Sequence, residues 1–107
     1  MVIYYHPVSR QIRYYERMEK YPYLNEAVAS VLARRRAELA MSKKRLSEHA
    51  FIERAYITGL EAGKWNVTLN VLFYLCDALG MAPEDFIREV TAEREKLHTG
   101  EEDRRTR

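Results

Sequence analysis

The segment from Ser42 to Gly63 constrains the fold most, because it predicts two short helices joined by a tight corner. Its first residue, a serine, can cap the first helix, which carries Leu46 and Ala50 on one face. The second helix places Ile57 and Leu60 on a buried stripe, and the glycine that closes the segment ends this helix. Helices this short are not stable alone, so the segment must pack on other helices of the chain.

Two runs of sequence carry a pattern around this corner: SKKRLSEHA before it and RAYITGLEAGKWNVTLNVLFYLCDALGM after it. The matching positions are Ser42, Leu46, Ile57, Thr58, Leu60, Glu61, Gly63, Lys64, Asn66, Thr68, Leu69 and Leu72. Over about residues 28 to 87 the chain therefore resembles the Cro/repressor-type helix-turn-helix family, also called the XRE family. The resemblance implies an all-α, lambda-repressor-like domain of five helices that binds double-stranded DNA with the second motif helix in the major groove.

Three positions depart from the family pattern. Ser47 replaces the usual alanine, Phe51 replaces the usual glycine of the corner, and Val67 replaces the usual proline. The corner often needs a positive φ, which a bulky side chain resists. Phe51 is therefore the departure that matters most for the geometry of the corner.

The length of the chain, 107 residues, suits one domain with extensions. Hydrophobic residues make up 47% and charged residues 32%, as in soluble globular proteins. No apolar run approaches the roughly 20 residues of a membrane span, and the N-terminus lacks the apolar core of a signal peptide. We therefore expect a cytoplasmic protein that makes no membrane contact.

The cysteine and the histidines give no sign of a catalytic or metal-binding site. Cys76, the one cysteine, lies in the apolar run LFYLCDALG and is expected to be a small buried hydrophobe. His6, His49 and His98 lack the spacing of metal ligands, and no carboxylate pair or nucleophile with an adjacent base is visible. We therefore expect no enzyme activity, no catalytic residue, no cofactor and no metal.

The net charge of +2 is distributed unevenly along the chain. Residues 28 to 65 contain eight lysines and arginines against four acidic residues, whereas residues 66 to 107 contain six against nine. The positive excess lies on the helix-turn-helix segment, as expected for a surface that meets phosphate groups.

The sequence divides into three parts. Residues 1–25 form an N-terminal extension outside the family match, predicted as an extended arm followed by an amphipathic helix. Its tyrosines can pack on the body or on a partner protein, or stack on DNA. Residues 26–98 form the DNA-binding domain with its last helix, and Asn25 is the expected cap of its first helix. Residues 99–107 form a charged tail that is expected to be flexible.

The exposed side of the second motif helix is the expected base-reading surface. Its residues are Arg54, Ala55, Tyr56, Thr58 and Gly59. An arginine can donate two hydrogen bonds to a guanine edge, and an alanine can touch a thymine methyl group. Tyr56 lies at the border of this face, where it meets either a phosphate or the protein body. A single strong base-reading side chain predicts modest specificity.

Two groups of residues are expected at the phosphate backbone. They are Ser42, Lys43 and Lys44 at the start of the first motif helix, and Lys64, Trp65 and Asn66 after the second. The first group lies where free N–H groups and the helix dipole favour an anion. The resemblance places the second group beside the backbone. For Trp65, packing on a helix or on a partner is the alternative.

Three consecutive arginines lie near the end of the first helix of the family match. Arg36 occupies the position where the family has an arginine that pairs with the glutamate near the end of the recognition helix, here Glu61. The resemblance thus implies a structural ion pair between these two residues. Arg34 and Arg35 are expected to be solvated, with phosphate contact as the alternative.

The last predicted helix, APEDFIREVTAEREKLH, carries an apolar stripe that continues beyond the family match. Its members are Phe86, Ile87, Val90 and Leu97. A stripe left in water is an association site, so these residues are the expected dimer contacts. The alternative is that tyrosines of the N-terminal extension cover the stripe within one subunit.

These features together predict a sequence-specific DNA-binding transcriptional regulator that occupies a two-fold symmetric operator as a homodimer. Two alternatives stay open. One is the antitoxin of a toxin-antitoxin pair, with the toxin held by an extension. The other is a protein-interaction module that kept the fold and lost DNA binding, an interpretation suggested by Phe51, Glu53 and the many tyrosines of residues 4 to 23.

Overall fold

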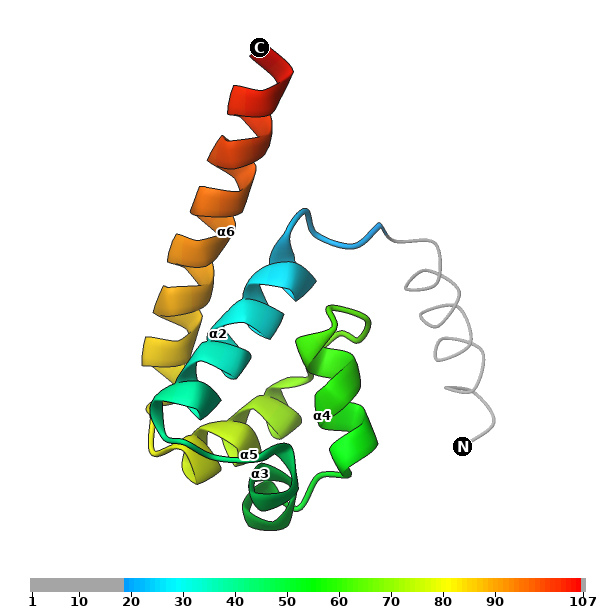
Figure 1. The fold of residues 1–107 in the computed structure, drawn as a ribbon, viewed down its shortest axis with the longest axis vertical. Helices are drawn as coiled ribbons and strands as arrows, with labels where there is room; N and C mark the ends of the chain where they lie inside the picture. The colour runs from blue at the N-terminus through cyan, green and yellow to red at the C-terminus, as the bar shows by residue number, and fades with distance from the viewer. Residues whose placement is uncertain (1–18, 107) are drawn as a thin grey trace, which may run out of the picture.

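Five α-helices make up the fold within residues 19–106, the part of the chain that the computed structural model describes. They are α2 (Leu24–Glu38), α3 (Lys43–Ala50), α4 (Arg54–Glu61), α5 (Leu69–Leu79) and α6 (Pro83–Thr106). Figure 1 shows α2 alongside α6, with α3 at the opposite end of the molecule from the last turns of α6. The predicted all-α helix-turn-helix fold is confirmed. The arm and helix predicted for the N-terminal extension fall outside the described residues.

Capping fixes where two of the helices begin. The Ser42 hydroxyl accepts a hydrogen bond from the Arg45 N–H at 3.0 Å, and the Thr68 hydroxyl accepts one from the Val71 N–H at 3.2 Å. Each bond satisfies a backbone donor that the first turn of a helix leaves free. Gly80 ends α5 in the left-handed conformation, with φ of 61°. These boundaries follow from the local sequence.

The start of α2 differs from the prediction of a cap at Asn25. Tyr23 takes the N-cap position in a left-handed conformation, with φ of 63° and no side-chain cap. Asn25 lies inside the helix and is buried, and its Nδ2 donates to Oδ1 of Asn66 at 2.9 Å. The prediction was wrong because the asparagine amide is used by a residue far along the chain, which a local capping signal does not reveal.

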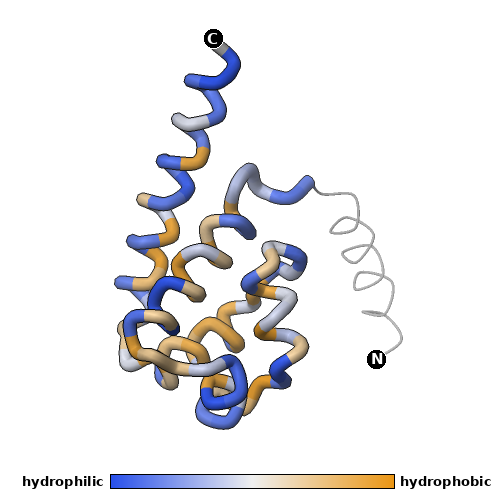
Figure 2. The backbone as a smooth tube through the Cα atoms, in the orientation of Figure 1, coloured by the Kyte–Doolittle hydropathy of each residue, from blue (hydrophilic) through white to orange (hydrophobic). Residues whose placement is uncertain are grey.

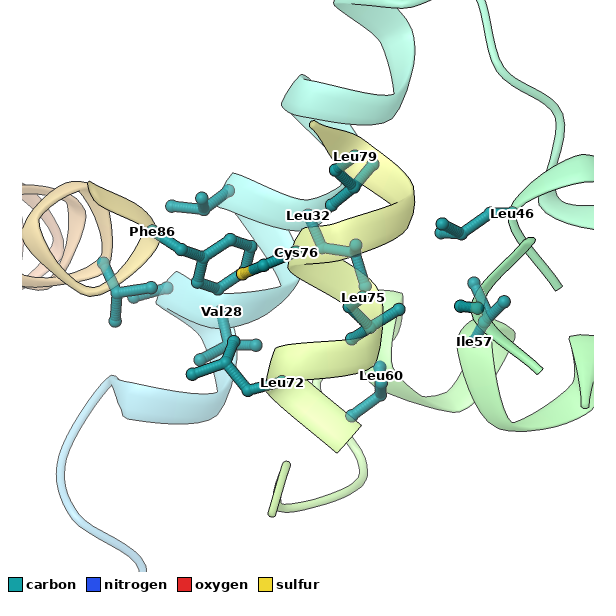
Figure 3. Packing of buried hydrophobic residues seen from close by; sticks show 14 residues of the cluster. Val28, Leu32, Leu46, Ile57, Leu60, Leu72, Leu75, Cys76, Leu79 and Phe86 are labelled. Carbon is teal, nitrogen blue, oxygen red and sulfur yellow. The ribbon is translucent and has the colours of Figure 1, made fainter. Parts of the chain in front are cut away.

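All five helices contribute to one hydrophobic core. Figure 2 shows hydrophobic residues concentrated where the helices meet, and mostly hydrophilic residues along the last turns of α6. In Figure 3, Phe86 points from α6 toward Cys76 of α5, while Leu46 and Ile57 of the two motif helices lie on the far side of α5. Burial raises the pKa of the Cys76 thiol to about 11, so the thiol is neutral at pH 7. Cys76 is therefore a buried core residue, as predicted.

The apolar stripe of α6 corrects the predicted dimer surface. Phe86 is 0% exposed and Val90 is 3% exposed, because both pack into the core of their own chain. Leu97 is partly buried against the same core. Only Ile87 remains largely on the surface, at 48% exposure. The prediction was wrong for Phe86 and Val90 because helical periodicity identifies an apolar face but not the element that covers it.

Polar side chains join α2 to α6 along their length. The Arg34 guanidinium pairs with Glu89 at 3.2 Å and with Glu93 at 3.4 Å, and the Ser30 hydroxyl donates to Glu93 at 3.1 Å. The Glu89 hydrogen bond is the main cause of the raised pKa of Arg34. Arg35 instead donates to two backbone carbonyl groups at the end of α5. The Arg34 side chain stays 43% exposed while it pairs with α6, in agreement with the predicted solvated state, whereas Arg35 is half-buried against the end of α5.

The residues just before α2 also pack against α6. Arg94 donates from Nε to the Pro22 carbonyl oxygen at 2.8 Å, and its guanidinium lies 4.4 Å from the centre of the Tyr21 ring. The rings of Tyr23 and His98 meet edge to face with their centres 5.7 Å apart. The segment leading into α2 is thus held against α6 at Arg94 and His98, neither of which belongs to the predicted dimer stripe.

The C-terminal tail is helical, whereas the sequence predicted a flexible tail from residue 99. α6 continues to Thr106, supported by Glu101 and Arg105 at 2.9 Å and by His98 and Glu102 at 3.7 Å. Such pairs one turn apart stabilise a helix by a few tenths of a kcal/mol each. No helix between residues 19 and 106 combines the length and the apolar character needed to cross a membrane.

Candidate nucleic-acid interface

The corner between α3 and α4 has the backbone conformation that its phenylalanine was expected to resist. Phe51 has φ of 57° and ψ of 39°, and its side chain is 83% exposed. Its ring makes only an edge contact with Tyr74, with centres 6.3 Å apart. Since the left-handed region costs a residue with a β-carbon about 1 to 2 kcal/mol, the corner forms in spite of Phe51.

Ser47, the second departure from the family pattern, helps to hold this corner. Its hydroxyl donates a hydrogen bond to the carbonyl oxygen of Ile52, and its own carbonyl accepts from the Ile52 N–H at 3.2 Å. The sequence marked Ser47 as unusual but gave it no role, because the hydroxyl acts on a residue beyond the turn.

The side of α4 turned away from the core carries Arg54, Ala55 and Thr58, all exposed. Ile57 and Leu60 are buried beneath them, as the predicted stripe requires. The Arg54 side chain makes no ion pair or hydrogen bond with any other described residue, so its guanidinium is available to a ligand. Three of the five predicted base-reading residues therefore share one accessible face.

Gly59 does not belong to that face, which corrects the prediction. It is buried in α4, because the indole ring of Trp65 lies directly against it. A β-carbon built on Gly59 would lie 1.7 Å from Nε1 of Trp65. Helical spacing placed Gly59 on the exposed side of α4, but spacing does not show that the following loop covers it.

Tyr56 lies on the flank of α4, where it contacts the loop between α4 and α5. Its hydroxyl donates to the carbonyl oxygen of Asn66 at 3.2 Å, so it meets the protein body, one of its two predicted alternatives. Asn66 is held from the other side by the bond from Asn25. Gly63 begins the loop with φ of 72°, a conformation that favours glycine. The loop is thereby tied to both α4 and α2.

Arg36 and Glu61 form the ion pair that the family resemblance implied. Nε and Nη2 of Arg36 each lie 2.8 Å from a carboxylate oxygen of Glu61, and Nη1 donates to the Met41 carbonyl oxygen at 2.9 Å. The hydrogen bond that Arg36 donates to Glu61 is the main cause of the raised pKa of Arg36. The Glu61 carboxylate is largely buried, at 9% side-chain exposure. This clamp fixes the end of α4 against α2 and the turn that follows α2.

Cations lie on α3, which precedes α4 in the chain, and on the loop that follows α4. Lys43 and Lys44 occupy the first turn of α3, which contains no acidic residue, beside the capping residue Ser42. Lys64 and Trp65 are exposed in the loop that follows α4. These residues offer hydrogen-bond donors at a helix N-terminus, positive charge and the exposed guanidinium of Arg54. Such a set suits a polyanion whose bases present hydrogen-bonding edges, as DNA does in its major groove. Within residues 19–106 no cluster of three or more histidine, cysteine or acidic side chains is placed to hold a metal ion.

Comparisons with known proteins agree with this geometry. Residues 31–91 match the family model of the Cro/C1-type HTH DNA-binding domain. The clp gene regulator ClgR from Corynebacterium glutamicum superposes with a TM-score of 0.75 at 27% identity, covering 79% of this chain and 90% of that one.

The restriction-modification controller protein C.Esp1396I is also similar, with a TM-score of 0.65 at 26% identity over 73% of this chain and 99% of its own. Its tetramer in complex with its natural 35 base-pair operator gives a TM-score of 0.63 at 25% identity, over 71% of this chain and 97% of its own. A search of curated protein sequences gave no match. The family match spans more than half of the chain, and the matching helices form the predicted motif, so the chain belongs to the Cro/C1-type helix-turn-helix DNA-binding domain family.

Proposed function

We propose that the chain is a sequence-specific transcriptional regulator that acts by occupying an operator as a homodimer. The observation that carries the proposal is the exposed face of α4, which presents an unpaired arginine and is held rigidly by the Arg36–Glu61 clamp. Family membership supports DNA binding. The similar proteins named above include a gene regulator and a controller protein in complex with its operator.

Base reading is assigned to Arg54, Ala55 and Thr58. The Arg54 guanidinium can donate two hydrogen bonds to O6 and N7 of a guanine, which is the commonest specific contact in the major groove. Ala55 and Thr58 suit a thymine methyl group or a base-edge hydrogen bond. Because the Tyr56 hydroxyl is bonded to the protein and Gly59 is covered, these two residues are left out of the assignment.

Phosphate binding is assigned to the two groups on either side of α4. Ser42, Lys43 and Lys44 at the start of α3 would meet one stretch of the DNA backbone, and Lys64, Trp65 and the amide nitrogen of Asn66 another. These contacts would carry most of the affinity and make it depend on salt, because each cation that neutralises a phosphate releases counterions. They would set the position of α4 in the groove without selecting bases.

Dimerisation is assigned to an apolar groove between α2, α5 and α6. The groove has a volume of about 240 Å³, and three large apolar residues on its rim are unusually exposed: Leu24 at 38%, Leu69 at 72% and Ile87 at 48%. A two-fold axis beside the groove would bury the same residues of both copies. Two recognition helices about 34 Å apart would then enter successive major grooves and compensate for the modest specificity of one.

Selection from genomic DNA tests the proposal. Purified full-length protein is incubated with sheared genomic fragments, and the retained fragments are sequenced. We expect a shared motif with two-fold symmetry. The matched control is Arg54→Ala, which should still retain DNA at low salt but lose the enrichment of the motif. Wild-type protein that retains no DNA would contradict the proposal.

One observation favours a second candidate, the protein-interaction module. The Phe51 side chain is 83% exposed in a strained conformation and meets a second exposed aromatic residue, Tyr74, at 47%. A partner protein that covered both rings would give this exposure a function. The same selection experiment separates the candidates, because a module that has lost DNA binding retains no fragments.

A further inference from the structure

Gly59 is a helical glycine with no conformational reason to be glycine. It lies in the middle of α4, and its φ is not among the positive values that the described residues show. Alanine is a much better helix former than glycine at such a position. The glycine is therefore explained by the side chain that packs against it.

The Trp65 side chain provides that reason. The five-membered ring of its indole takes the place of a side chain at Gly59, since an added β-carbon would lie 1.7 Å from Nε1 and 2.0 Å from Cδ1. Both atoms belong to a rigid ring, so the contact could be relieved only by moving the whole indole. Trp65 is nevertheless 51% exposed, so one side of the ring rests on α4 and the rest faces solvent.

The backbone around Trp65 is fixed to the same flank of α4. The Lys64 N–H donates to the Gly59 carbonyl oxygen at 3.0 Å, and the Tyr56 hydroxyl donates to the Asn66 carbonyl oxygen at 3.2 Å. Gly59 and Tyr56 lie one turn apart on this flank, next to the exposed face that carries Arg54. Trp65 is therefore held beside the base-reading face, between two residues that are bonded to α4.

We infer that Gly59 is a positioning residue, whose missing side chain seats Trp65 so that the exposed part of the indole packs against the sugar-phosphate backbone beside the groove that α4 enters. The inference rests on the proposed DNA-binding function. A helix in the major groove has a phosphate backbone along each flank, and the indole offers a flat apolar surface for deoxyribose with no selection among bases. The seat sets the angle between the recognition helix and the loop that contacts the backbone.

Three full-length variants test the seat: Gly59→Ala, Trp65→Ala and the double variant. Binding is measured by anisotropy with a labelled duplex of mixed sequence at low salt, where phosphate contacts dominate. We expect Trp65→Ala to weaken binding by about fivefold or more, the lower end of what one aromatic contact to a nucleotide contributes. Gly59→Ala should weaken it to a similar extent, and the double variant should bind no more weakly than Trp65→Ala alone.

Intrinsic fluorescence gives a second measurement, because Trp65 is the one tryptophan of the chain. Displacing the indole into water should shift the emission of Gly59→Ala to longer wavelength. The matched control is Gly100→Ala, since Gly100 is also helical and a β-carbon there meets nothing within 4 Å. This control should leave both the emission and DNA binding unchanged.

The outcomes separate this inference from the function on which it rests. Wild-type protein that binds no DNA overturns both. Wild-type protein that binds, with Trp65→Ala or Gly59→Ala binding equally well, overturns the seat alone. The seat is also overturned if the loss of DNA affinity in the double variant equals the product of the two single losses. Gly59 and Trp65 act through one contact in this inference, so that contact can be lost only once.

Discussion

Arg36 joins three parts of the chain through one guanidinium group. It binds both carboxylate oxygens of Glu61 and the Met41 carbonyl oxygen, all at 2.8 to 2.9 Å. Its side chain is 20% exposed and that of Glu61 is 9% exposed, so removal of either partner leaves a poorly solvated charge. The pair therefore belongs to the stability of the fold and to the placement of α4.

We expect Arg36→Ala and Glu61→Ala each to lower the free energy of unfolding by about 3 kcal/mol, as is usual when one partner of a buried pair is removed. The loss in the double variant should be clearly smaller than the sum of the single losses. Urea denaturation of the four proteins of this cycle measures the coupling. Additive losses would show that the two side chains do not stabilise each other.

Phe51 stores strain that glycine would release. We expect Phe51→Gly to be more stable than Phe51→Ala by about 1 kcal/mol, because both variants lose the contact with Tyr74 but only glycine favours a φ near 57°. Denaturant midpoints of the two variants measure the difference. Equal stability of the two would mean that the corner changes conformation when the ring is removed.

At the scale of the helices, the proposed function gives phosphate contacts to α3 and to the loop after α4, and base contacts to α4. We expect Lys43→Ala and Lys64→Ala to weaken binding to all sequences alike and to reduce the salt slope of log K by about 1 each. Arg54→Ala should instead cost about 1 to 3 kcal/mol, mainly on the preferred site. Titrations at several salt concentrations with a selected fragment and a mixed-sequence duplex distinguish the two effects. An unchanged slope in both lysine variants would contradict the phosphate assignment.

Several helix ends were predicted correctly because they are coded locally, although the start of α2 and the end of α6 were not. Ser42, Thr68 and Gly80 act through neighbouring backbone groups, and the corner motif is likewise a local pattern. Arg36 and Glu61 are far apart in sequence, and their pairing was predicted only because a family pattern linked the two positions.

The remaining features depend on contacts between elements that periodicity does not specify. The packing of the indole on Gly59, the hydrogen bond between the side-chain amides of Asn25 and Asn66, and the burial of Phe86 each join separate helices or loops. Spacing alone placed Gly59 on the base-reading face and Phe86 on a dimer surface. Both errors have the same cause, since a helical pattern gives the direction of a side chain but not what lies opposite.

At the scale of the whole molecule, the proposed dimer surface is the groove between α2, α5 and α6. Cutting the chain after Ile87 would remove Val90 from the core, so substitutions on the groove rim are the better test. We expect Leu69→Glu and Ile87→Glu to be monomeric at micromolar concentration, to stay helical and to lose most operator affinity. The control is Leu39→Glu, because Leu39 is similarly exposed, at 40%, but does not line the groove.

Sedimentation velocity of the wild type and the three variants decides the matter. Wild-type protein that is monomeric at this concentration without DNA would contradict the homodimer. The predicted alternative, a cover formed by Tyr4, Tyr5, Tyr14 and Tyr15, would then be the next candidate for the groove; these four tyrosines lie outside the described part of the chain.

α6 is one continuous helix, but its two ends are stabilised by different contacts. Its first turns insert Phe86 and Val90 into the core, whereas its last turns are supported mainly by pairs of residues on α6 itself, such as Glu101 and Arg105. We expect the amide protons around Phe86 and Val90 to exchange with solvent mainly when the whole domain opens, and those near the end of α6 to exchange through local fraying. Hydrogen exchange along this one helix would therefore measure two separate opening equilibria. The residue at which protection falls would mark the end of the cooperatively folded unit.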